Sequence, residues 1–146
     1  MYAIRRWSSR HARGLERLYK ATRPGILSGL RLVTRLFGKR LDRPITATER
    51  LLKGALFDCQ MCGDCVLSKT GMTCPMNCPK GIRNGPCGGV RANGMCEVKP
   101  DMRCVWVDAW NGAAKMEDGD AIKDIEFAVD HSRVGQSSWL RLARDE

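Results

Sequence analysis

The chain has 146 residues, of which 43% are hydrophobic and 28% are charged, a composition typical of a globular protein rather than a disordered one. This length allows one domain with an arm and excludes two large domains. Aromatic residues make up only 6% of the chain and there are 15 glycines, which argues against the large apolar core of a stand-alone enzyme. No stretch approaches the ~18 to 20 apolar residues of a transmembrane helix, so no membrane span is expected.

Apolar residues near the N-terminus recur at the spacing of an amphipathic helix. One such pattern runs from Ile4 to Leu18 and a second from Ile26 to Phe37. We expect a break between the two helices near Pro24, because proline interrupts a helix interior.

A third helix is predicted immediately before the cysteines. Gly38 should end the second helix, and the proline-containing residues 42–44 should form a turn. Thr46, with Glu49 three residues later, matches a capping box, which predicts a helix that begins at Thr46 and reaches Phe57.

All of the excess positive charge lies in residues 1–50. Residues 1–50 hold 13 Lys or Arg and three Asp or Glu, whereas residues 51–146 hold 12 and 13. Such an arm can contact nucleic acid, an anionic membrane surface or an acidic protein surface. The arm lacks interleaved aromatic residues and a groove-reading motif, and its helices carry apolar stripes. We therefore interpret residues 1–57 as a basic helical arm that docks on a protein partner, and nucleic acid is disfavoured.

All eight cysteines fall within residues 58–116, where helical periodicity disappears and Gly and Pro are frequent. Such a segment cannot bury enough apolar surface to order itself unaided, so a bound metal is expected to supply the missing order. The candidate metal ligands are Cys59, Cys62, Cys65, Cys74, Cys78, Cys87, Cys96 and Cys104.

The cysteine spacing favours iron–sulfur clusters. The run C-x2-C-x2-C places three thiols on one tight loop, as in bacterial ferredoxins, and a Cys-Pro follows later in the chain. Zinc ribbons use two C-x2-C pairs, and only the first half of that pattern is present. Eight cysteines match the ligand count of two [4Fe–4S] clusters; zinc, alone or beside one cluster, and disulfides are the alternatives.

The N-terminus carries no sign of a secretory signal peptide. Arginines follow Met1 closely, and no apolar segment of about 7 to 15 residues comes after them. A cytoplasmic, reducing location is therefore expected, in which clustered thiols bind metal rather than forming disulfides.

Residues 117–146 are interpreted as an acidic helical tail. The acidic residues of 117–120 are expected to cap a helix that carries Ile122, Ile125 and Val129. Ser138 is expected to cap a final short helix. The expected fold class is thus a small α-helical protein with an irregular Cys-rich metal-binding core: N-terminal amphipathic helices, a loop-rich two-cluster core over 58–116, and short C-terminal helices.

Four segments of the chain resemble a known family. They are FDCQMCGDC at 57–65, TCPMNCPK at 73–80, NGPCGG at 84–89 and WVDAW at 106–110. Together they are similar to the MetV-type family, also called the methylenetetrahydrofolate reductase C-terminal domain family, over about residues 57–116. Members of this family are small partners of a flavin-bearing MetF-type barrel, or are fused to it.

The resemblance implies that the cysteines hold two [4Fe–4S] clusters. By analogy with ferredoxins, we expect Cys59, Cys62, Cys65 and Cys78 to bind one cluster, and Cys74, Cys87, Cys96 and Cys104 to bind the other. One cluster with zinc, or zinc alone, is the alternative occupancy. FMN or FAD is expected on the partner chain.

The resemblance further implies an accessory subunit rather than a catalytic one. The chain has no nucleotide-binding GxGxxG motif and no evident acid–base pair, and its only histidines are His11 and His131. It would carry electrons from a low-potential donor to a MetF-type flavoprotein that interconverts methylene- and methyl-tetrahydrofolate. The alternatives are a structural zinc or cluster module that stabilises this partner without a redox role, and a metal-containing nucleic-acid-binding protein.

Overall fold

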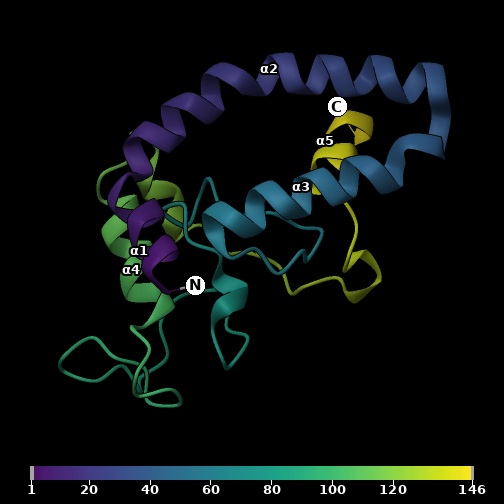
Figure 1. The fold of residues 1–146 in the computed structure, drawn as a ribbon. Helices are drawn as coiled ribbons and strands as arrows, with labels where there is room; N and C mark the ends of the chain where they lie inside the picture. Colours follow the sequence, from purple (N-terminus) through teal and green to yellow (C-terminus); the bar gives the residue numbers. More distant parts are fainter. Residues whose placement is uncertain (1, 146) are drawn as a thin grey trace.

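The computed structural model describes residues 2–145. Two long antiparallel helices frame the molecule (Figure 1). Helix α2 spans Ala12–Phe37 and is followed by a 3₁₀ turn, η1, at Gly38–Leu41; the chain then returns in α3, Asp42–Phe57. The last helix, α5, spans Ser138–Asp145 and contacts both α2 and α3.

The remaining helices surround the irregular segment that carries the cysteines. Helix α1, Tyr2–Arg10, packs against α3 and against α4, Val105–Ala113. Three further 3₁₀ turns lie in the loops: η2 at Pro75–Asn77, η3 at Gly119–Lys123 and η4 at His131–Arg133.

The expectation of a mostly helical protein with a loop-rich Cys segment is confirmed. Residues 2–145 contain no β-strand, only an isolated bridge between Met95 and Arg103. None of the helices described in this range combines the length and apolar character needed to cross a lipid bilayer.

The expected helix break near Pro24 is wrong, because α2 runs through this residue without interruption. The carbonyl of Lys20 loses its helical N–H partner at Pro24, but both residues are exposed, so water can reach that carbonyl. The break lies instead at His11, where the chain turns so that α1 can pack on α4. Gly38 ends α2 as expected, with a positive φ of 57°.

The predicted start of α3 at Thr46 is also wrong, since the helix already begins at Asp42. Pro44 then lies in the first turn, where its missing N–H would have had no helical partner in any case. Thr46 is inside the helix, and Glu49 makes a buried ion pair rather than a capping box.

The predicted tail helix over Ile122, Ile125 and Val129 does not form. Only η3 is present there, and Ile125 is 86% exposed. The backbone N–H and C=O of Glu126 bond instead to the side-chain amide of Asn84, at 2.6 and 2.7 Å, which holds this segment extended. The final helix forms as expected, but the hydroxyl that caps it is that of Ser137, which accepts from the Leu140 N–H at 3.1 Å.

A buried carboxylate joins the basic arm to the segment after α4. Glu16 on α2 is 1% exposed and accepts the backbone N–H groups of Glu117 and Asp118 at 2.7 and 3.0 Å. Lys20 lies 3.0 Å from Glu16 and 2.8 Å from the Asp118 carboxylate. Burial alone would raise the pKa of Glu16, but the two N–H groups and Lys20 together lower it.

The Glu16→Gln variant is expected to be less stable than the wild type by about 1–3 kcal/mol at pH 7, because buried N–H groups lose a charged acceptor. The pKa of Glu16 in the folded state lies below the ordinary 4.5. The stability that the Glu16 carboxylate contributes is therefore fully present above pH 4.5 and is lost as the pH falls through the folded-state pKa. Urea unfolding should show that the free energy of unfolding is lower for the variant than for the wild type at pH 7, and that this difference becomes smaller in acid. A difference in unfolding free energy that does not change with pH would contradict the role of the Glu16 charge.

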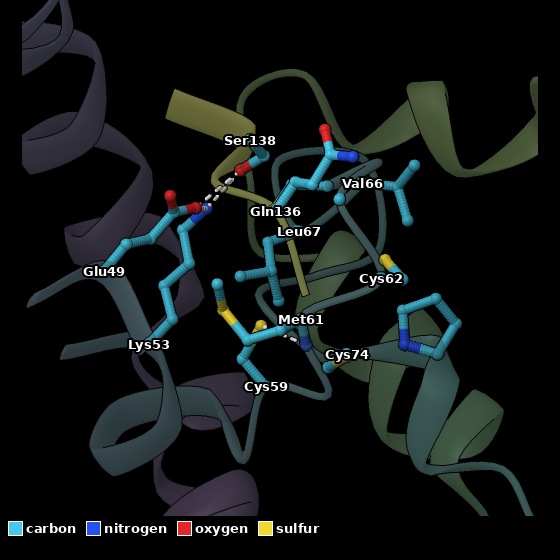
Figure 2. Close-up of a pocket in the computed structure, with 13 residues that line it drawn as sticks. Glu49, Lys53, Cys59, Met61, Cys62, Val66, Leu67, Cys74, Gln136 and Ser138 are labelled. Carbon is cyan, nitrogen blue, oxygen red and sulfur yellow. Dashed lines mark hydrogen bonds and ion pairs between the residues drawn. The ribbon is translucent and has the colours of Figure 1, made fainter. Parts of the chain in front are cut away.

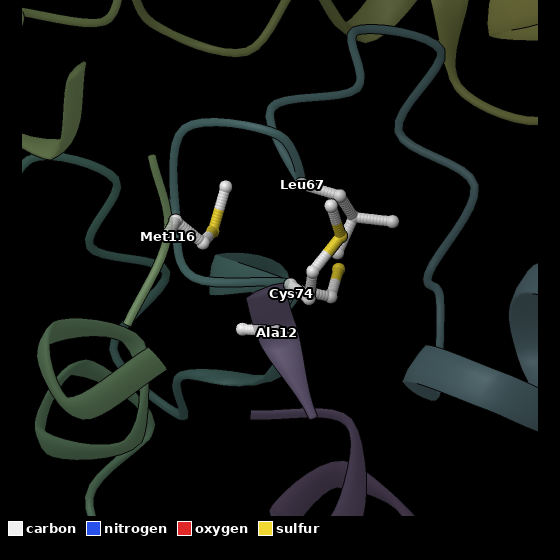
Figure 3. Packing of buried hydrophobic residues seen from close by; sticks show 5 residues of the cluster. Ala12, Leu67, Cys74 and Met116 are labelled. Atoms are coloured by element: carbon white, nitrogen blue, oxygen red, sulfur yellow. The ribbon is translucent and has the colours of Figure 1, made fainter. Parts of the chain in front are cut away.

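One of the cysteines belongs to the main apolar cluster of the fold. Ala12, Leu67, Met72, Cys74 and Met116 are all buried and pack together, as Figure 3 shows for this cluster. The cluster joins α2 to the Cys-rich loops and to the end of α4. The position of Cys74 is therefore fixed by packing as well as by its neighbours along the chain.

Candidate metal centre

The cysteine triplet of residues 59–65 lies on a tight loop that follows α3 directly. Asp58 and Met61 adopt left-handed backbone conformations, with φ of 53° and 49°, and Gly63 has a φ of 75°. A Cβ on Gly63 would lie 2.2 Å from the Arg133 carbonyl oxygen, so only glycine fits against η4 here. These turns fold the triplet around a common interior.

Four cysteines line one small cavity inside this loop: Cys59, Cys62, Cys65 and Cys74. Figure 2 shows Cys59, Cys62 and Cys74 among the residues that line this cavity. The backbone N–H of Met61 donates to Cys59 Sγ at 3.4 Å. The rest of the wall comes from α3, from the loop around Leu67 and from residues 136–138 before α5.

The protein environment separates the pKa values of these thiols. The hydrogen bond from Cys74, helped by the Met61 N–H and Lys53, lowers the pKa of Cys59 to about 6. The same hydrogen bond, together with burial, raises the pKa of Cys74. Burial also raises the pKa of Cys65. The cavity thus stabilises a thiolate, the form of cysteine that binds metal, at Cys59.

A buried ion pair forms one wall of the cavity. Lys53 and Glu49 are 6% and 1% exposed, and Lys53 Nζ lies 2.5 Å from Glu49 Oε1. Lys53 Nζ also donates to Ser138 Oγ at 2.7 Å and lies 5.0 Å from the centre of the Trp139 ring. Burial disfavours the ammonium, but the charges of Cys65, Glu49 and Cys59 outweigh it and raise the pKa of Lys53. A cation is therefore held beside the thiols.

A second buried cation lies beside Cys62 of the triplet. Arg83 is 6% exposed, and its Nη1 lies 3.9 Å from Cys62 Sγ. Its Nη2 donates to the carbonyl oxygen and the carboxylate of Asp64 at 2.9 and 3.0 Å. Arg141 of α5 donates to the other Asp64 oxygen at 2.7 Å. Asp64 ties the loop to α5.

The other four cysteines are spread over two apolar clusters and a half-buried position. Cys96 is buried with Met102, and Cys78 packs against them. Cys104 is buried with Trp106 at the start of α4. Cys87 is half-buried, with its Sγ 3.9 Å from a Glu97 carboxylate oxygen.

The arrangement differs from the expected grouping, because Cys74 rather than Cys78 lies beside the triplet. The intervening loop folds back through the Met72 N–H, which donates to the Leu67 carbonyl at 3.0 Å. Turn η2 then carries Cys78 away toward Cys96. Asn77 fixes this turn by donating to the Asp58 carbonyl at 3.0 Å. All eight cysteines are free thiols in the structure.

The four cysteines of the cavity are a donor set that both a [4Fe–4S] cluster and a zinc ion can use, with different spacing between the sulfurs. In a [4Fe–4S] cluster the cysteines bind different irons, so the four sulfurs surround the group without meeting. A tetrahedral zinc with bonds of about 2.3 Å would instead bring its sulfurs within about 4 Å of one another. Among the residues that the structure describes, no three Cys, His, Asp or Glu side chains are grouped closely enough to hold a metal ion as they stand.

Sequence reasoning missed the charged residues around the cysteines. Asp64 binds two arginines, Arg83 and Arg141, which lie far from it in the sequence. Asp108 is 4% exposed and lies 2.7 Å from Arg103 Nε. The spacing of Glu49 and Lys53, one helical turn apart just before the first cysteine, is the one signal that points to their pairing.

Comparison with known proteins yields one family match. The family described as "Methylene-tetrahydrofolate reductase C terminal" matches residues 39–132, more than half of the chain. No curated protein and no solved structure matches. The matched region contains α3, all eight cysteines and α4, and it extends the resemblance seen over residues 57–116 in both directions. The chain therefore belongs to the methylene-tetrahydrofolate reductase C-terminal family.

Proposed function

We propose that this chain is the iron–sulfur subunit that passes single electrons to a flavin-bearing methylenetetrahydrofolate reductase subunit. The observation that carries the proposal is the set of four thiols around one cavity, in a chain whose family is associated with that reductase. Two buried cations beside these thiols support it, since a cluster with four thiolate ligands is an anion that needs compensating charge.

Two sets of four cysteines would each hold one cluster. Cys59, Cys62, Cys65 and Cys74 form the first set because they share the cavity. Cys78, Cys87, Cys96 and Cys104 are left for the second. Bound clusters of this type supply one-electron redox chemistry. The chain's own part is to hold them, to exclude water around Cys74 and Cys96, and to donate N–H groups such as that of Met61 toward sulfur.

The partner would dock on an apolar groove between α2, α3 and α5. Leu18, Ile26, Leu52 and Leu56 are exposed and line this groove. Cys65 and Lys53 lie in the same groove, so a protein seated there would come close to the first cysteine set. Basic residues of α2 flank the apolar ones, which favours a partner surface that is apolar at its centre and acidic at its rim.

The double variant Leu52→Asp/Leu56→Asp is expected to weaken binding to the flavoprotein subunit at least about tenfold, because it places charge at the centre of an apolar contact. Phe127→Asp is the matched control, since Phe127 is 88% exposed and lies outside the groove. Binding should be measured by calorimetry under anoxic conditions. Equal affinities for the two variants would contradict docking at this groove.

The function is tested by mixing the anaerobically purified chain with its flavoprotein partner. Reduced viologen should reduce the partner's flavin much faster when the iron-loaded chain is present, because the chain relays single electrons. Cys62→Ala should stop this relay. A purely structural module predicts the opposite pattern: the Cys62→Ala variant would release the partner, and the intact complex would give no faster flavin reduction.

A further inference from the structure

The ion pair of Glu49 and Lys53 has a fixed orientation relative to the cysteine cavity. Glu49 receives hydrogen bonds from the Ser137 and Ser138 hydroxyls and from the Trp139 N–H. All three donors lie at the start of α5, so the carboxylate is held toward that helix. Figure 2 shows Glu49, Lys53 and Ser138 together on one side of the cavity.

The positive end of this pair acts on the thiols most strongly. Lys53 lines the same cavity as Cys59 and Cys65, and its charge acts on both thiols. Glu49 lines the cavity as well, and its charge acts on Cys59 with the opposite sign. The two charges are buried, so water screens them little.

We propose that Lys53 and Glu49 set the reduction potential of the group held by Cys59, Cys62, Cys65 and Cys74, with Lys53 raising it and Glu49 lowering it. This inference rests on the proposed function. Lys53 and Glu49 are positioning residues here: neither ligates a metal, and both act through the field that they produce at the sulfurs.

The sign follows from charge alone. Reduction adds one electron, taken from an external one-electron donor, and no bond forms or breaks at Lys53 or Glu49. A neighbouring cation stabilises the more negative, reduced form, and a neighbouring anion destabilises it. Removing Lys53's charge should therefore lower the potential, and removing Glu49's charge should raise it.

The test is an EPR-monitored potentiometric titration of the full-length, iron-loaded chain, with viologens as mediators. Lys53→Met should decrease the reduced-to-oxidised ratio of one cluster about tenfold at a fixed ambient potential, equivalent to a fall of about 59 mV for a one-electron couple. Glu49→Gln should shift the same cluster by a similar amount in the opposite direction. The second cluster should keep its potential in both variants.

Further variants separate the effect of charge from that of damage to the fold. Lys39→Met removes the same charge from an exposed position on η1 and should leave both potentials unchanged. If Lys53→Met alone does not fold because Glu49 is left unpaired, the double variant Glu49→Gln/Lys53→Met removes both charges. Because Lys53 acts on the thiols more strongly than Glu49, the potential of this double variant should lie below that of the wild type and above that expected for Lys53→Met.

Shifts of the same sign in Lys53→Met and Glu49→Gln, or no shift in Glu49→Gln, would overturn the inference, because a purely structural role does not produce opposite signs. Iron content distinguishes this failure from failure of the proposed function. Iron-loaded protein with unshifted potentials refutes only the tuning role. A chain that takes up zinc and no iron refutes the electron-transfer function and the tuning role together.

Discussion

Replacing Cys74 with alanine is expected to remove the same cluster as replacing Cys65, whereas replacing Cys78 should remove the other one. The reason is that Cys74 shares a cavity with Cys65, while Cys78 packs against Cys96. The wild-type chain should bind about eight irons, four in each [4Fe–4S] cluster. Each single variant should therefore lose about half of the iron, measured after anaerobic reconstitution.

Double variants decide which cysteines act together, because losses within one site do not add and losses at separate sites do. Cys65→Ala/Cys74→Ala should retain as much iron as either single variant. Cys65→Ala/Cys78→Ala should retain almost none. The opposite pattern would restore the grouping that ferredoxin-like reasoning favours, with Cys78 beside the triplet.

The Gly112→Ala variant is expected to be strongly destabilised, although alanine ordinarily favours a helix over glycine. Gly112 lies on α4 against Gly71, and an added Cβ would stand 2.3 Å from the Gly71 carbonyl oxygen. Gly71 has a φ of 60°, and a Cβ added there would lie 2.2 Å from the Ala109 carbonyl oxygen. Neither backbone can yield without moving α4 away from the loop that carries Cys74. Overpacking of this kind costs about 1–3 kcal/mol, and sometimes more.

Gly29→Ala is the matched control for this prediction. Gly29 lies within α2, and no atom would come within 4 Å of an added Cβ. This substitution should stabilise the chain by about 0.5–1 kcal/mol, the ordinary difference between the two residues in a helix. Thermal unfolding of the two variants should move in opposite directions from the wild type. A Gly112→Ala protein as stable as the wild type would contradict the close approach of α4 and the loop.

Local patterns predicted the helical arm and the absence of long helices among the cysteines, since both depend on residues near each other in sequence. The helix ends were less predictable. In the sequence, Pro24 and Pro44 both indicate helix breaks. In the structure, Pro24 lies at an exposed position within α2, and Pro44 lies in the first turn of α3. In each case the cost of a missing N–H depends on surroundings that the sequence pattern does not contain.

The candidate metal site likewise has features that the sequence predicts and features that only the fold reveals. The ligand types and the triplet could be identified from spacing, but the fourth member of the cavity could not. Cys74 and Cys78 are equally plausible along the chain, and only the turn at η2 and the packing of Cys74 with Ala12 separate them. Lys53 was not identified because its partners, Ser138 and Trp139, lie about 85 residues away.

The central claim is that the thiols hold iron clusters, and metal analysis tests it most directly. Iron, acid-labile sulfide and zinc should be quantified together in the chain purified without oxygen from cells that supply all three. We expect about eight irons and as many sulfides per chain, with a broad visible absorption that dithionite bleaches. A colourless chain that contains zinc and no iron, or one whose cysteines are paired as disulfides in active material, would contradict it.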